Sequence, residues 1–92
     1  MKRPEVTRSN IIWAKQMATQ AYDWALENID GAHGVFASGH EVLGKLKEEF
    51  DEFSDAVHAN AGREALIGEL QDIIVIAMHS LASITSNEMD IE

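Results

Sequence analysis

Apolar residues recur at helical spacing along most of the chain. The first such segment covers about residues 6–29, where successive residues are about 100° apart around a helix. Its apolar side holds Ile11, Ala14, Ala18, Tyr22, Ala25 and Ile29. Three of the six glycines then follow closely, at positions 31, 34 and 39. This pattern predicts an amphipathic helix over about residues 6–29 that is followed by a glycine-rich loop.

The second segment begins with Ser38-Gly-His-Glu41, which has the Ser-x-x-Glu spacing of a helix capping box. The spacing predicts that the Ser38 side chain accepts a hydrogen bond from the backbone of Glu41 and that the Glu41 side chain reaches back. An apolar side then follows at Val42, Leu46, Phe50, Phe53 and Val57. We therefore expect a second helix over about residues 38–60.

The third segment follows a short turn at Asn60-Ala-Gly62 and begins at about Arg63. Its apolar side holds Leu66, Leu70, Ile73, Ala77 and Leu81. The stretch from Ile73 to Met78 is apolar around the whole helix, so it must be covered on every side, which favours a second subunit. No strand pattern is present, and the tail over residues 86–92 has no pattern and is expected to fray.

These patterns predict one all-α domain over residues 1–92, in which three helices form a bundle that is completed across a homodimer or a dimer of dimers. With 92 residues, the chain buries only roughly 60–65% of its extended surface, which also favours a homodimer or homotetramer.

Composition narrows the possible partners and compartments. The chain holds 7 Lys and Arg against 16 Asp and Glu, for a formal charge of −9, which argues against binding of nucleic acid or an anionic membrane. It has no cysteine, so disulfides and thiolate metal sites are excluded. The charged residues 1–8 lack the apolar run of a signal peptide, and the longest apolar run is far shorter than the roughly 20 residues that span a bilayer. We expect a cytoplasmic protein without a membrane segment.

Two pairs of acidic residues lie at the edges of the apolar sides of the second and third helices. Glu49 and Glu52 are three residues apart, as are Glu69 and Asp72, so each pair projects from one side of its helix. The two pairs can face each other if the helices pack antiparallel. Four converging carboxylates repel one another unless a cation offsets their charge, and Mg²⁺ or Mn²⁺ prefers such ligands. The alternative is that these acids are ordinary polar-face residues.

The same acids carry a resemblance to a known family. Glu48-Glu49-Phe50-Asp51-Glu52, followed after sixteen residues by Glu69-Leu70-Gln71-Asp72, resembles the E-E-x-x-E … E-x-x-D signature of MazG-like all-α nucleoside triphosphate pyrophosphohydrolases. The resemblance covers about residues 38–82. It implies hydrolysis of a nucleoside triphosphate between the α and β phosphorus atoms, which gives the monophosphate and pyrophosphate.

The resemblance also implies roles for individual residues. Glu49, Glu52, Glu69 and Asp72 would be the Mg²⁺ ligands, and Glu48 would orient or deprotonate the attacking water. Basic residues for the phosphates are scarce, because no Lys or Arg follows Arg63. Lys45 can contact phosphate or pair with Glu49, and Arg63 can serve from a neighbouring subunit.

Aromatic and histidine residues give weaker indications. Trp13, Met17 and Trp24 share a second side of the first helix, where they can stack on a nucleobase or pack against another subunit. The four histidines, which include His79, show no metal-ligand spacing, and we expect them to be mostly ordinary surface or turn residues. Two alternatives stay open: a non-catalytic helical interaction module, and a related dUTPase-like or phosphoribosyl-ATP pyrophosphohydrolase.

Overall fold

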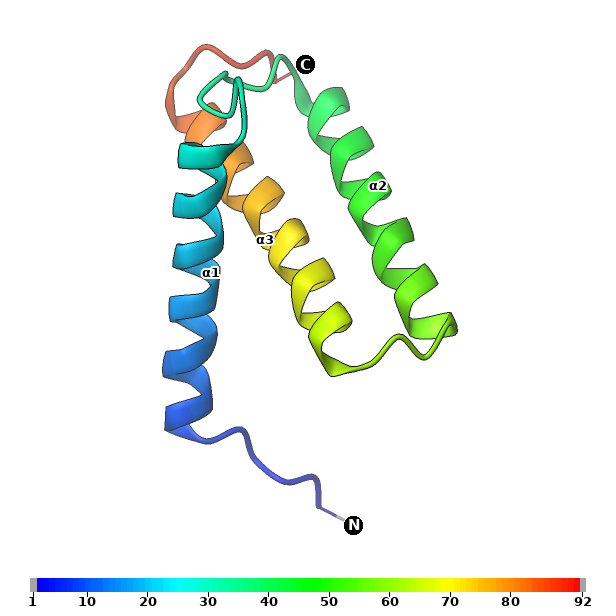
Figure 1. Cartoon of the computed structure of the whole chain (residues 1–92). Helices are drawn as coiled ribbons and strands as arrows, with labels where there is room; N and C mark the ends of the chain where they lie inside the picture. The colour runs from blue at the N-terminus through cyan, green and yellow to red at the C-terminus, as the bar shows by residue number, and fades with distance from the viewer. Residues whose placement is uncertain (1, 92) are drawn as a thin grey trace.

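The computed structural model describes residues 2–91 and is helical (Figure 1). It contains α1 (Arg8–Asn28), α2 (Gly39–His58) and α3 (Arg63–Thr85), which confirms the prediction of an all-α chain of three helices. The bounds of α1 and α2 lie within two residues of those predicted, and α3 begins where predicted. Strand-like pairing in the described chain is limited to one isolated bridge between Ser38 and Asp90.

Hydroxyl side chains begin two of the helices. The Thr7 side chain accepts a hydrogen bond from the Asn10 backbone N–H at the start of α1. At the start of α2, Ser38 accepts from the Glu41 backbone N–H, as the capping box predicts. The Glu41 carboxylate instead accepts from the Ala37 N–H at 2.8 Å, one residue before the position that a capping box predicts.

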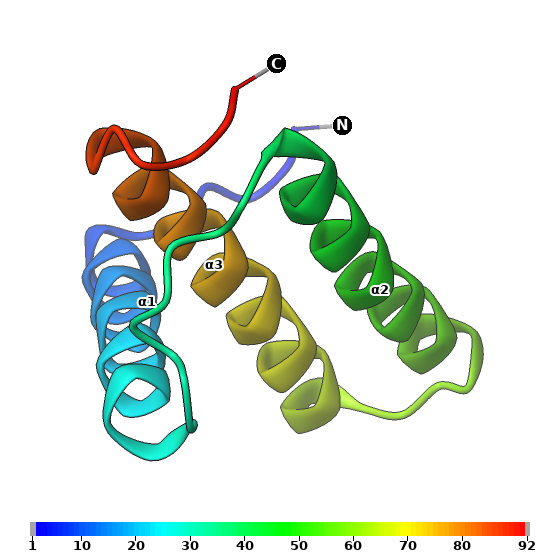
Figure 2. The same cartoon turned by 90° about the horizontal axis from the view of Figure 1, so that it is seen from above.

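The three helices form an open layer with α3 in the middle, between α1 and α2 (Figure 2). α2 and α3 run antiparallel, whereas α1 runs in the same direction as α3 (Figure 1). α3 packs against both neighbours, and within the described residues α1 and α2 do not pack against each other. The radius of gyration is 15.1 Å, compared with about 12.3 Å for a compact chain of this length.

Many large apolar side chains are exposed in the single chain. The buried apolar residues in the described chain are Ala25 and Met89. The accessible surface is 7322 Å², about 2000 Å² more than the roughly 5300 Å² expected for a compact monomer of this mass. The apolar middle of α3 remains half-buried, and Ala77 is exposed. The cover that this stretch requires is therefore not supplied within one chain.

His79 on α3 fastens α1 and the loop that follows it. Its Nδ1 lies 2.8 Å from the Tyr22 hydroxyl, and its Nε2 lies 2.7 Å from the carbonyl oxygen of Gly34. A carbonyl only accepts, so Nε2 carries the proton and the Tyr22 hydroxyl donates to Nδ1. The His79 ring also packs edge-on against Phe36. His79 thus differs from the ordinary surface or turn residue that the sequence predicted.

The C-terminal tail lies against the same loop instead of fraying as expected. The Asp90 N–H donates to the Ala37 carbonyl at 2.9 Å, and the Gly39 N–H donates to the Asp90 carbonyl at 3.2 Å. Met89 beside them is buried. Glu92, the last residue of the predicted tail, lies outside the described residues, as does Met1 of the predicted domain. The loop and the described tail therefore hold each other in place.

Of the described helices, α3 is long and apolar enough to cross a membrane by length and composition. The core helix of a soluble helical protein passes the same test, so one such helix is weak evidence for a membrane segment. Little of its most apolar stretch is buried within the single chain, which agrees with the uncovered surface described above.

Candidate metal centre

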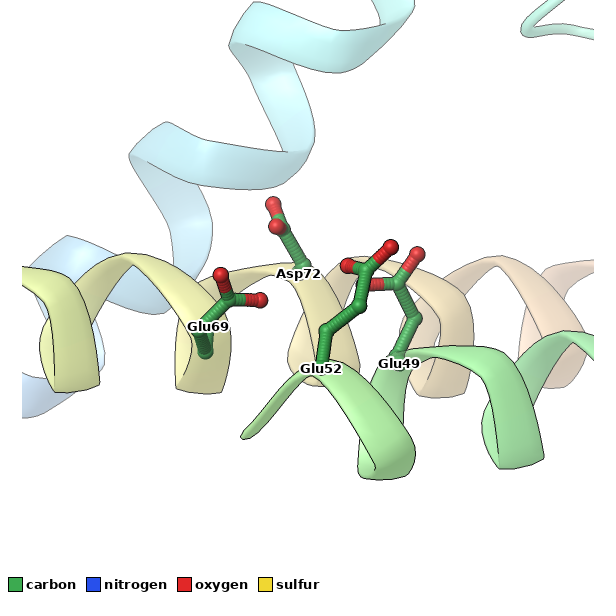
Figure 3. A group of neighbouring side chains, drawn as sticks. All are labelled: Glu49, Glu52, Glu69 and Asp72. Atoms are coloured by element: carbon green, nitrogen blue, oxygen red, sulfur yellow. The ribbon is translucent and has the colours of Figure 1, made fainter. Parts of the chain in front are cut away.

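Four carboxylates meet where α2 and α3 lie side by side (Figure 3). Glu49 and Glu52 project from α2, Glu69 and Asp72 project from α3, and their carboxylates lie on the same side of the two helices. Each side chain offers one oxygen, and these four oxygens lie within 4.8 Å of one another. The three-residue spacing puts each pair on one side of its helix, and the antiparallel packing brings the two pairs together.

The group is partly removed from water. Glu49 and Glu69 are half-buried, whereas Glu52 and Asp72 are exposed. The Oε2 atoms of Glu49 and Glu69 are buried, and neither has a hydrogen-bond partner. A buried carboxylate oxygen without a partner is costly, so both atoms are available to a cation.

Burial and mutual repulsion raise the pKa values of three of these carboxyls. Burial, the charges of Glu52 and Asp72, a hydrogen bond with Glu52 and the charge of Glu69 together raise the pKa of Glu49 to about 7, and burial is the largest cause. The pKa of Glu69 is raised by desolvation first and then by the neighbouring carboxylates. The pKa of Asp72, whose side chain remains exposed in part, is raised by partial desolvation and then by the charge of Glu52. Each of these causes raises the pKa, and none of them is a basic side chain.

The donor set fits a hard divalent cation. All four ligands are carboxylate oxygens, which Mg²⁺, Mn²⁺ and Ca²⁺ prefer over nitrogen or sulfur ligands. Opposite ligands lie about 4.2 Å apart around Mg²⁺ and roughly 4.6–5.2 Å apart around Ca²⁺. The 4.8 Å span of the group is close to both values, so the geometry supports this class of cation without selecting one member.

A pocket of about 430 Å³ opens beside the carboxylates. Glu49 and Asp72 form one side of it, and Gln20 and Trp24 of α1 are on its lining with Gln71 of α3. The Trp24 side chain is 60% exposed, so its ring is open to a ligand. A space of this size is within the range of small-molecule sites. The arrangement therefore places an aromatic ring and two amides next to a cation site.

The other residues singled out from the sequence lie outside the carboxylate group. Glu48 is exposed on α2, about 100° around the helix from Glu49. Lys45 lines a second pocket, of about 310 Å³, with His79. Arg63 lies at the turn between α2 and α3. Trp13 is 59% exposed and is not on the lining of the pocket beside the carboxylates.

Two features of the site were missed in the sequence. Gln20 and Gln71 line the pocket, and neither was singled out as a candidate. Gln20 and Trp24 are four residues apart, which places them on one side of α1, and this spacing was a usable signal. Gln71 also donates from Nε2 to the Met17 carbonyl at 3.4 Å, a contact that no local pattern indicates.

Comparison with known proteins adds no relative. No protein-family model matches the chain, and no curated protein sequence or solved structure matches it either. The resemblance to MazG-like pyrophosphohydrolases therefore rests on the two acidic motifs and their sequence context.

Proposed function

We propose that the chain is a Mg²⁺-dependent nucleoside triphosphate pyrophosphohydrolase of the MazG-like class. The observation that carries the proposal is the convergence of Glu49, Glu52, Glu69 and Asp72. The two buried oxygens without partners and the raised pKa of Glu49 indicate that a cation would relieve an unfavourable cluster. We also propose that Mn²⁺ can take the place of Mg²⁺ and that the protein acts in the cytoplasm.

Different residues would bind the metal, activate the attacking water and contact the base. Glu49, Glu52, Glu69 and Asp72 would hold the metal, which when bound would supply positive charge against the negative charge that develops on the phosphates. Glu48 would orient the attacking water and take its proton as the anhydride bond between the α and β phosphates breaks. The products are the nucleoside monophosphate and pyrophosphate. Trp24, which lines the adjacent pocket, is better placed than Trp13 to stack on the base.

We also propose that the active form is a homodimer, or a dimer of such dimers. Exposed apolar residues recur every seven residues on α2 and on α3, a spacing typical of helices that pack along a shared seam. They are Leu43, Phe50 and Val57 on α2 and Leu70, Ala77 and Ile84 on α3. The accessible surface of the chain is about 2000 Å² larger than that of a compact monomer, which is more than the roughly 800 Å² that each partner buries in a standard interface.

The direct test is a panel of nucleoside and deoxynucleoside triphosphates with Mg²⁺ and a readout of pyrophosphate. We expect release by the wild type and at least a hundredfold loss in Glu49→Gln and Asp72→Asn, with retained helicity. Asp51→Asn is the matched control, since this residue lies in the same motif but outside the carboxylate group. Absence of pyrophosphate from every substrate would overturn the proposal. Inclusion of dUTP and phosphoribosyl-ATP separates the related enzymes.

A non-catalytic helical interaction module is the second candidate function. The large uncovered apolar surface favours it, since such surfaces mark sites of association. Thermal unfolding with and without Mg²⁺ discriminates between the two. A cation that binds the native state raises the midpoint, whereas the module predicts no shift.

A further inference from the structure

The segment before α1 is an extended arm, residues 2–7. Every residue of the arm is exposed. Figure 1 shows the arm running beyond the ends of the helices. Its hydrogen bonds within the described chain are those of Thr7 with Asn10 and Ile11, which begin α1. The arm is therefore free of the helical layer of its own chain.

Charge is distributed very unevenly between this end of the molecule and the remainder. Residues 1–22 hold four basic residues and one acidic residue, a formal charge of +3. Residues 23–92 hold three basic and fifteen acidic residues, a formal charge of −12. The basic residues of the first part are Lys2, Arg3, Arg8 and Lys15. Arg8 begins α1, whose first turn has no acidic residue, although a helix N-terminus favours negative charge.

Apolar side chains adjoin these basic residues. Val6 is 69% exposed and Trp13 is 59% exposed, and Ile11 and Ile12 between them are about half exposed. A partner for this surface must be acidic and apolar. The remainder of the same chain offers both, in the carboxylate group and in the uncovered sides of α2 and α3. A polyanion such as nucleic acid or an anionic membrane would be repelled by the −12 charge of residues 23–92 and is therefore a poorer partner.

We propose that the arm of one copy, with the start of α1, docks beside the carboxylate group of a second copy and brings Arg3 and Arg8 to that group, where they contact substrate phosphates. The phosphate contacts rest on the proposed function, whereas the docking does not. Complementary charge supports a second copy as the occupant. Ile11 and Ile12 lie on α1 and are about half exposed, so their own chain leaves them available to a second copy. The basic groups that the site lacks in one chain are thereby supplied by the next.

Cross-linking tests the docking without any assay of activity. Because the chain has no cysteine, single introduced cysteines report one position each. We expect a short bismaleimide to join Val6→Cys of one chain to Gln20→Cys of another, since Gln20 lines the pocket beside the carboxylates. The yield should fall at high salt, which screens exposed charges. His33→Cys, in the loop beyond α1, is the control that should not link to Val6→Cys.

Mixing of two impaired variants tests the phosphate contacts. The first variant, Arg3→Ala/Arg8→Ala, lacks Arg3 of the arm and Arg8 at the start of α1, and the second, Glu49→Gln, lacks a proposed metal ligand. Each should lose activity alone, and an equal mixture should recover about a quarter of wild-type activity, because half of the dimers then hold one intact site. Lys47→Ala removes a basic residue of α2, outside the basic part of the chain, and should retain activity.

The outcomes separate the two proposals. A cross-link within a single chain that carries both cysteines, or no cross-link at all, overturns docking in trans. If the cysteine variants give no cross-link, and the wild type binds anionic vesicles or RNA while Arg3→Ala/Arg8→Ala does not, the arm binds that partner instead. If the cross-link forms but the mixture of variants recovers no activity, the arm serves only to join the two copies, and the proposed phosphate contacts are wrong. If the wild type releases no pyrophosphate, the proposed function fails, while the cross-link still decides the docking.

Discussion

Glu49 is one of three carboxyls whose raised pKa makes the stability of the chain depend on pH. Its pKa of about 7 lies above the ordinary value near 4.3, so between these values the folded chain binds more protons than the unfolded chain. The free energy of unfolding should therefore fall as pH rises through this window. We expect a lower melting temperature at pH 8 than at pH 5 in EDTA, measured by circular dichroism.

Two further melts check the cause. Glu49→Gln should flatten the pH dependence and melt higher than the wild type at pH 8, because the repulsion is relieved. Mg²⁺ should raise the wild-type melting temperature at pH 8 more than at pH 5, where protons compete for the carboxylates. A wild-type melting temperature that rises from pH 5 to pH 8 without metal would contradict this account.

Ser83 holds the loop through one buried hydrogen bond. Its side chain is 1% exposed and accepts from the Phe36 backbone N–H at 3.0 Å. Ser83→Ala leaves that N–H without a partner, and we expect the free energy of unfolding to fall by about 1–3 kcal/mol in urea titrations. Thr85→Ala, on an exposed position two residues later, should change it by less than about 0.5 kcal/mol. Equal effects would argue against the role of the buried bond.

Replacing two glycines, one inside α2 and one just before α3, by alanine should change the free energy of unfolding in opposite directions. Gly44 lies inside α2, where an added Cβ meets nothing within 4 Å, so Gly44→Ala should stabilise the chain by roughly 0.5–1 kcal/mol. Gly62 precedes α3 at a φ of 95°, in the left-handed region, so Gly62→Ala should destabilise it by about 1–2 kcal/mol. Urea titrations of both variants provide the comparison, and stabilisation by Gly62→Ala would contradict the assigned backbone.

The helices were predictable from the sequence because their signals are local. The Ser38 cap, the turn at Gly62 and the apolar spacing all act within a few residues, and the bounds followed from them. Three-residue spacing places Glu49 with Glu52 and Glu69 with Asp72 on one side of each helix, so the meeting of the two pairs was expected if the helices packed antiparallel. The bond between Tyr22 and His79 joins residues 57 apart in the chain, so no local pattern could indicate it. The tail pairing through Asp90 was missed for the same reason.

Assembly should be visible in the dependence of stability on protein concentration. Leu81 on α3 is 65% exposed in the single chain, on the same side as the seam residues Leu70 and Ile84. We expect Leu81→Glu to convert the dimer to a monomer in sedimentation equilibrium and to make the melting temperature independent of concentration. Ile91→Glu, at an equally exposed residue outside the helices, should leave the dimer intact. A wild type that sediments as a monomer at all concentrations would contradict the dimer.

The central place of α3 has a consequence for how this sequence can change over time. Within the described residues α1 and α2 do not pack against each other, so substitutions on one should add to those on the other in their effect on folding. α1 can then accept substitutions without compensating substitutions in α2, and the reverse also holds. α3 has no such freedom, since a change on one of its sides alters the packing of α1 and a change on the other alters the packing of α2. Substitutions that are accepted on α3 should therefore be followed by matching changes in whichever neighbour they face.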